Sequence, residues 1–141
     1  RNLCEFAKAL SEGIVKAVRP EKAWHEKLSA FLKSLRIGFK IDSLSGDPSF
    51  DIGIGDIEHP DKTIKEIFEY MEAGDKPCIV AIDEFQQIRE YPETGTEAFI
   101  RTLVQQCSRT SFIFCGSKRH TMPALIIGSI QIVIPSVSLA P

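Results

Sequence analysis

The chain has 141 residues, of which 43% are hydrophobic and 26% are charged, and its formal net charge is −2 at pH 7. This length allows one domain with a sizeable core but not two ordinary ones, and the charge lacks the basic excess typical of proteins that bind nucleic acid or anionic membranes. No apolar run approaches the length of a membrane span, so we expect no membrane association.

Two amphipathic helices are predicted at the start of the chain. Apolar residues recur at helical spacing from Leu3 to Val18, and Arg19-Pro20 ends this helix because the residue before a proline is disfavoured in the α region. A second helix follows, with one apolar face between Trp24 and Leu35. The spacing of Trp24 within that face indicates a core residue.

A β-hairpin is predicted next, because the apolar spacing changes from the helical period to alternation. The alternating stretches cover residues 37–41 and 50–54, and the turn residues SLSGDPS lie between them. Asp61 then has the position of an N-cap for a third helix, which extends through Met71.

An apolar strand, a helix and a second apolar strand follow in order. The first strand is expected at 78–83, and the second is the apolar run SFIFC at 111–115. Between them, Thr94 or Thr96 starts a helix, whose expected buried residues are Phe99, Leu103 and Cys107. Two such strands joined by a helix form a βαβ unit, which predicts an α/β fold with a parallel sheet covered on both faces.

The C-terminal stretch 123–141 has a different composition and carries no charge after Pro123. Its alternation through Ile130, Ile132 and Ile134 is typical of a strand, which Pro135 would end. We treat 123–141 as an apolar tail separate from the domain formed by 1–122.

The residues Asp83 and Glu84 come directly after the first apolar strand, in the stretch CIVAIDEFQ. Acidic side chains are almost never buried without a partner, so this pair needs either solvent or a cation. In α/β sheets, ligands bind outside the carboxyl ends of the strands, which is where both acids are expected. The pattern fits a cation site, and it also fits the start of an exposed loop.

Two segments resemble the archaeal-type ATPase family, a branch of the AAA+ and STAND P-loop ATPases. They are IVAIDEFQQI and, after a helix, FIFCGSKRHTM, while residues 39–55 resemble the insert that this family carries before Walker B. The similarity extends over residues 1–122. It implies a parallel P-loop-type (ASCE/AAA+) sheet flanked by helices, with a β-hairpin insert.

The same resemblance implies a role for each matching residue. Asp83 would be the Walker B ligand of Mg²⁺ and so part of the ATP site, and Glu84 would be the catalytic glutamate that polarises the attacking water. Ser117 would occupy the sensor-1 position at the γ-phosphate, and Arg119 would bind phosphate charge. Gln86 either continues this polar network or is a solvated loop residue. The expected cofactors are ATP and Mg²⁺, an oligomer is compatible with the family, and the protein or DNA partner is unidentified.

The chain departs from this family in two places. It contains no G-x-x-x-x-G-K-[ST] motif, whose backbone N–H groups and lysine hold the phosphates. We therefore expect the first strand, this loop and the helix after it to precede residue 1, and the chain alone to be inactive as an ATPase. The tail 123–141 also differs from the charged segment and helical lid of the family. A reading-frame difference near Met122 and an unusual natural terminus both fit that tail.

A second function from another class fits the sequence. Without a phosphate-binding loop, the chain would be a non-enzymatic α/β module that binds a protein partner through its hairpin and its tail. A Mg²⁺-dependent nuclease is less well supported, because it needs more clustered acids than one pair.

The cysteines and histidines are scattered, and no CxxC pair occurs among them. This spacing argues against a zinc site, and a chain with this much apolar core needs no disulfide framework. We therefore expect reduced cysteines and a cytoplasmic location.

Overall fold

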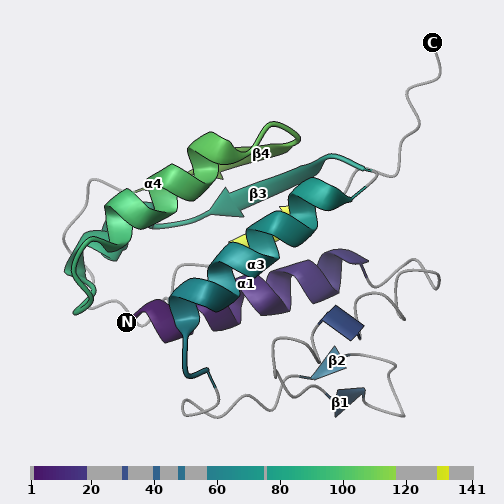
Figure 1. Cartoon of the computed structure of the whole chain (residues 1–141), viewed down its shortest axis with the longest axis horizontal. Helices are drawn as coiled ribbons and strands as arrows, with labels where there is room; N and C mark the ends of the chain where they lie inside the picture. Colours follow the sequence, from purple (N-terminus) through teal and green to yellow (C-terminus); the bar gives the residue numbers. More distant parts are fainter. Residues whose placement is uncertain are drawn as a thin grey trace.

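The computed structural model of the chain describes residues 2–18, 30–31, 40–41, 48–49, 57–74, 76–116 and 130–133. Their elements, in chain order, are α1 (Leu3–Val18), β1 (Lys40–Ile41), β2 (Pro48–Ser49), α3 (Pro60–Ala73), β3 (Cys78–Ile82), the 3₁₀ helix η1 (Phe85–Glu90), α4 (Thr96–Gln106), β4 (Thr110–Phe114) and β5 (Ile130–Val133) (Figure 1). The fold is a small α/β structure, as the sequence predicts.

A three-stranded sheet in the order β4-β3-β5 forms the centre of the described structure. β3 and β4 are parallel, with a register from Cys78 opposite Thr110 to Ile82 opposite Phe114, which confirms the predicted βαβ unit. β5 pairs with the other edge of β3 and is antiparallel to it. The sheet is therefore mixed, and the prediction of a wholly parallel sheet is wrong. The strand expected in the tail 123–141 is present as β5.

The helices α1, α3 and α4 lie on one face of this sheet (Figure 1). Alternate residues of β3 face them and are buried, and the ring of Phe112 in β4 stacks on Phe68 of α3 at a centroid distance of 5.4 Å. On the opposite face, Ile113 and Val133 are 51% and 54% exposed. Among the described elements no helix covers that face, so the predicted two-sided covering is not found there.

The helix α1 follows its predicted pattern from the first residue to the last. Its apolar stripe is buried against α3 and β5; the buried members are Leu3, Phe6, Ala7, Leu10, Ile14 and Val15. Gly13 lies on the side that contacts β5, where a Cβ atom would be 3.4 Å from the side chain of Ile132. α1 therefore approaches the sheet closely and brings its N-terminal turn to the carboxyl end of β3.

The start of α3 differs from the prediction. His59 is the N-cap, Pro60 is the first helical residue, and Asp61 lies inside the first turn. Proline is favoured at the first helical position because its missing N–H group would have no partner there, and an acid in the first turn interacts well with the helix dipole. The prediction of Asp61 as the N-cap is thus wrong by two positions.

The helix α4 begins at Thr96, one of its two predicted starts. Gly95 precedes it with a left-handed backbone (φ 76°), and the Thr96 hydroxyl donates to the carbonyl oxygen of Glu93 at 2.9 Å. Leu103 is buried as expected, whereas Phe99 and Cys107 are only half-buried, and Ile100 is the fully buried residue that the prediction omitted.

Only parts of two predicted elements lie within the described residues. Ala30 and Phe31 of the second predicted helix are helical, and the position of Trp24 lies outside the description. β1 and β2 pair antiparallel, with Lys40 opposite Ser49, as expected for a hairpin. β2 lies within the predicted turn, however, and the predicted second strand 50–54 lies outside the described residues. None of the described helices has the length and the apolar character needed to cross a membrane.

A carboxylate near the end of α3 holds the turn that leads into β4. Glu72 accepts hydrogen bonds from the backbone N–H groups of Ser108, Arg109 and Thr110 at 3.0, 3.1 and 2.8 Å. Partial burial raises the pKa of Glu72, but these backbone N–H groups outweigh it and lower the pKa from 4.5 to about 2. The contact fixes where β4 begins beside β3.

We predict that Glu72→Gln lowers the free energy of unfolding by about 1–2 kcal/mol, because a charge-assisted contact is lost at a solvent-accessible site. The pKa of Glu72 is lower in the folded than in the unfolded chain, so its contribution is complete above pH 4.5 and declines toward pH 2. Urea unfolding of both proteins should therefore show a difference at pH 7 that shrinks as the pH falls through this window. Glu69→Gln, at an exposed position of the same helix, is the matched control. An equal loss in both variants would contradict the assignment.

Candidate functional site

The two acids singled out by the sequence lie at the carboxyl end of β3, beside the carboxyl end of β4. Ile82 is buried at the end of the strand, Asp83 is exposed, and Glu84 is half-buried. The strand thus remains apolar up to its last residue and then places both carboxylates at the surface. Solvent reaches the pair, so neither acid needs a buried partner.

Backbone hydrogen bonds continue the pairing of the two strands past their ends. The N–H group of Cys115 donates to the carbonyl oxygen of Ile82 at 2.9 Å, and that of Phe85 donates to Cys115 at 3.2 Å. The rings of Phe85 and Phe114 are in contact, with centroids 4.4 Å apart. The segment after the acids therefore stays alongside residues 115 and 116, directly before Ser117.

Glu84 has a left-handed backbone conformation (φ 52°, ψ 40°), the one positive φ among the described non-glycine residues. This region costs a non-glycine residue about 1–2 kcal/mol. The N–H group of Glu84 donates to Oδ1 of Asp83 at 2.9 Å, and its carbonyl oxygen accepts from Gln87 at the start of η1. Backbone strain of this kind persists only where the surrounding structure holds it in place, and it clusters at functional sites.

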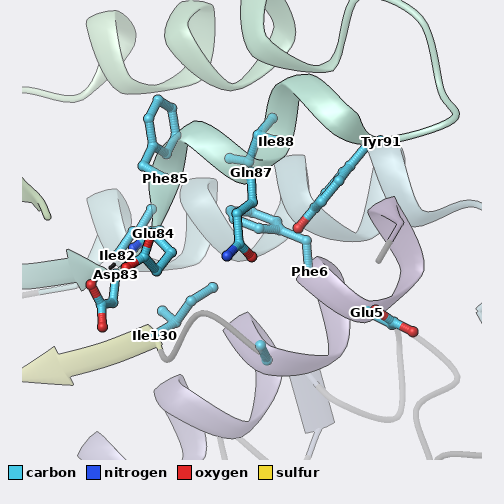
Figure 2. Close-up of a pocket in the computed structure, with 11 residues that line it drawn as sticks. Glu5, Phe6, Ile82, Asp83, Glu84, Phe85, Gln87, Ile88, Tyr91 and Ile130 are labelled. Carbon is cyan, nitrogen blue, oxygen red and sulfur yellow. Dashed lines mark hydrogen bonds between the residues drawn. The ribbon is translucent and has the colours of Figure 1, made fainter. Parts of the chain in front are cut away.

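A small hollow of about 30 Å³ opens beside the two acids, between the end of β3, η1 and the first turns of α1 (Figure 2). Its walls are partly apolar and partly polar, and the apolar part includes Phe6, Ile88 and Tyr91. Three acidic residues line it as well, Asp83, Glu84 and, from α1, Glu5, whose side chain points away from the other two (Figure 2). A hollow in which apolar walls meet a few polar groups is a candidate ligand site, although this one is small.

The first turn of α1 is fixed at this hollow by two caps. The side-chain oxygen of Asn2 accepts the N–H of Glu5 at 2.9 Å, and the carboxylate of Glu93 accepts the N–H of Leu3 at 3.2 Å. Oxygen ligands satisfy N–H groups that have no partner within the helix. Since Glu93 lies between η1 and α4, its contact joins α1 to the segment that follows the acids.

A second hollow lies at the start of α4 and carries both signs of charge. Glu97 pairs with Arg89 at 2.7 Å and with Arg101 at 2.8 Å, and its pKa is lowered chiefly by the hydrogen bond from Arg89. These exposed charges compensate one another, which makes this surface a weaker candidate than the end of β3.

The donor groups at the end of β3 suit some metals and not others. Within the described part of the chain, no three His, Cys, Asp or Glu side chains are close enough to hold a metal ion together. A closed zinc or calcium site therefore has no support there. Mg²⁺ usually keeps several waters and binds one or two carboxylates together with substrate phosphates, and the pair Asp83-Glu84 fits that requirement.

Of the predicted site residues, the structure brings Asp83 and Glu84 together. Ser117 and Arg119 lie outside the described residues, although Gly116, the residue before Ser117, is next to Gln86. Sequence reasoning missed Glu5 and Tyr91 at the site. The helical pattern marks Glu5 only as an exposed acid in a first turn, and no local signal shows which distant strand end that turn lies beside.

The chain matches no protein-family model, no curated protein and no solved structure. The function must therefore be argued from the site itself.

We predict that Glu84→Gly raises the free energy of unfolding by about 0.5 kcal/mol, since glycine relieves the left-handed strain but loses more entropy on folding. Glu90→Gly, at an exposed position of η1, should lower stability and serves as the matched control. Denaturant unfolding of both variants measures the difference. If both lose the same stability, Glu84 is not strained.

Proposed function

We propose that this chain carries the metal-binding and catalytic acids of an ATP-hydrolysing ATPase of the AAA+/STAND type. The observation that carries the proposal is the position of Asp83 and Glu84 at the carboxyl end of β3, next to a parallel strand and a small hollow. The resemblance of the segments around β3 and β4 to the archaeal-type ATPases supports the same activity.

The two acids differ in their surroundings, which supports different roles. Asp83 is exposed and would hold Mg²⁺, which supplies positive charge to the phosphates when it is bound with ATP. Glu84 is half-buried beside the hollow and would accept a proton from the attacking water. One carboxylate neutralises a cation while the other stays free to act as a base.

The compartment proposed for this activity is the cytoplasm. All four cysteines are free; they are Cys4, Cys78, Cys107 and Cys115. Free thiols fit a reducing environment.

The metal-binding role of Asp83 can be tested with Mn²⁺ as a paramagnetic probe for the Mg²⁺ site. We predict that one equivalent of Mn²⁺ broadens the amide resonances of residues 82–87 before others, and that Asp83→Asn removes this selectivity. Asp61→Asn, which changes an exposed acid in the first turn of α3, should leave it unchanged. Equal broadening at all surface acids would contradict the proposal.

The catalytic role of Glu84 needs a chain in which a phosphate-binding loop precedes residue 1, because the 141 residues contain no G-x-x-x-x-G-K-[ST] motif. In such a chain we predict that Glu84→Gln lowers ATP turnover by about 10²–10⁴-fold while ATP stays bound, since glutamine keeps the size of glutamate but accepts no proton. Asp83→Asn should weaken Mg-ATP binding as well. Measurements of turnover and of ATP affinity separate the two roles. A Glu84→Gln variant that turns over ATP as fast as the parent would refute the catalytic role of Glu84.

A second candidate is a non-enzymatic module that binds a protein partner. It is favoured by the exposed apolar side chains on β4 and β5, with Ile113 and Val133 more than half exposed. Apolar side chains gathered on one sheet face are typical of interaction surfaces. Loss of selective Mn²⁺ broadening in the parent chain would make this the better explanation.

A further inference from the structure

We propose that Gln86 is a positioning residue for Glu84, and that Gly116 provides the space in which Gln86 does so. The consequence for rate rests on the proposed function, whereas the contact itself can be tested in the chain without nucleotide. Neither residue has a role in the site described so far.

The first observation is a hydrogen bond from the side chain of Gln86. Its Nε2 group donates to Oε2 of Glu84. The left-handed backbone of Glu84 reverses the chain at the end of β3, so the side chain of the second residue after it comes back to the carboxylate. The bond therefore fixes one carboxylate oxygen of the strained residue.

The second observation is the close approach of Gly116 to Gln86. A Cβ atom at position 116 would lie 2.5 Å from Oε1 of Gln86 and 3.3 Å from its Cδ. Both distances are shorter than ordinary van der Waals contact. The φ angle of Gly116 is not positive, so its backbone conformation does not require glycine. The closeness of the Gln86 side chain is the better reason for a glycine at this position.

The strand ladder places these two residues together. The N–H group of Phe85 donates to Cys115, which sets residues 85–86 beside residues 115–116. Because the amide end of Gln86 can rotate, an alanine at 116 would push that amide away rather than break the backbone. Gly116→Ala should thus remove the contact between Gln86 and the carboxylate of Glu84 without replacing either residue.

The position of the Glu84 carboxylate matters for its proposed role as a general base. A base must lie within hydrogen-bond reach of the proton that it accepts, and a displacement of about 1 Å can cost up to about a hundredfold in rate. Loss of the contact should lower kcat about tenfold or more and leave KM for ATP unchanged, because Gln86 does not itself bind the nucleotide.

The contact is tested by NMR of the chain as it stands. We expect the side-chain amide resonances of Gln86 to be displaced from those of free glutamine, and to return to them in Glu84→Ala and in Gly116→Ala. Glu90→Ala, an exposed acid at the end of η1, should leave them unchanged. Free-glutamine resonances in the parent, or a displacement that survives Glu84→Ala, would overturn the proposal.

The positioning role is tested by kinetics in the chain that carries a phosphate-binding loop. We expect Gln86→Ala and Gly116→Ala each to lower kcat, and the double variant to be no slower than either, because both act through one contact. Gln105→Ala on the exposed side of α4 is the control. If the kcat losses of the two single variants multiply in the double variant, the positioning role is overturned even if NMR shows the contact. A parent chain without ATPase activity would refute the ATPase proposal and, with it, the positioning role of Gln86. The contact between Gln86 and Glu84 is judged by NMR alone.

Discussion

The parallel pairing of β3 with β4 is the constraint on which the rest of the structure depends. It sets the carboxyl ends of two strands side by side, and backbone hydrogen bonds continue it through Cys115 to Phe85. The acids after β3 and the residues before Ser117 meet for this reason. The crossover through α4 makes the pairing possible, and the contact of Glu72 with the turn before β4 sets where the second strand starts.

The site combines a rigid support with a strained residue. Buried apolar side chains hold β3 up to Ile82, and the very next residues are a solvated aspartate and a glutamate in a left-handed conformation. Water reaches the acids, while Phe6 and Tyr91 give the hollow beside them an apolar wall. Such a wall lowers the local dielectric constant, which strengthens the interaction of a carboxylate with a bound cation.

Much of the local structure followed from the spacing of apolar residues. The bounds of α1, the strand before the acids and the helix-linked strand β4 were all predicted, because burial on one face imposes a period that short segments display. The caps of α3 and α4 were less accessible. Neither His59 nor Gly95 makes a side-chain cap hydrogen bond, so the Ser, Thr, Asp or Asn side chain that most clearly marks an N-cap was absent.

The sequence by itself determined that an apolar strand ends in Asp83 and Glu84 and that a helix leads from it to a second apolar strand, since these features depend only on neighbouring residues. The tertiary structure decided that β5 pairs antiparallel with β3, that the helices gather on one face, and that the first turn of α1 lines the hollow beside the acids. It also decided that Gln86 turns back to Glu84 beside Gly116. These contacts join segments far apart in the chain or depend on one backbone reversal, and neither leaves a periodic signal in the sequence.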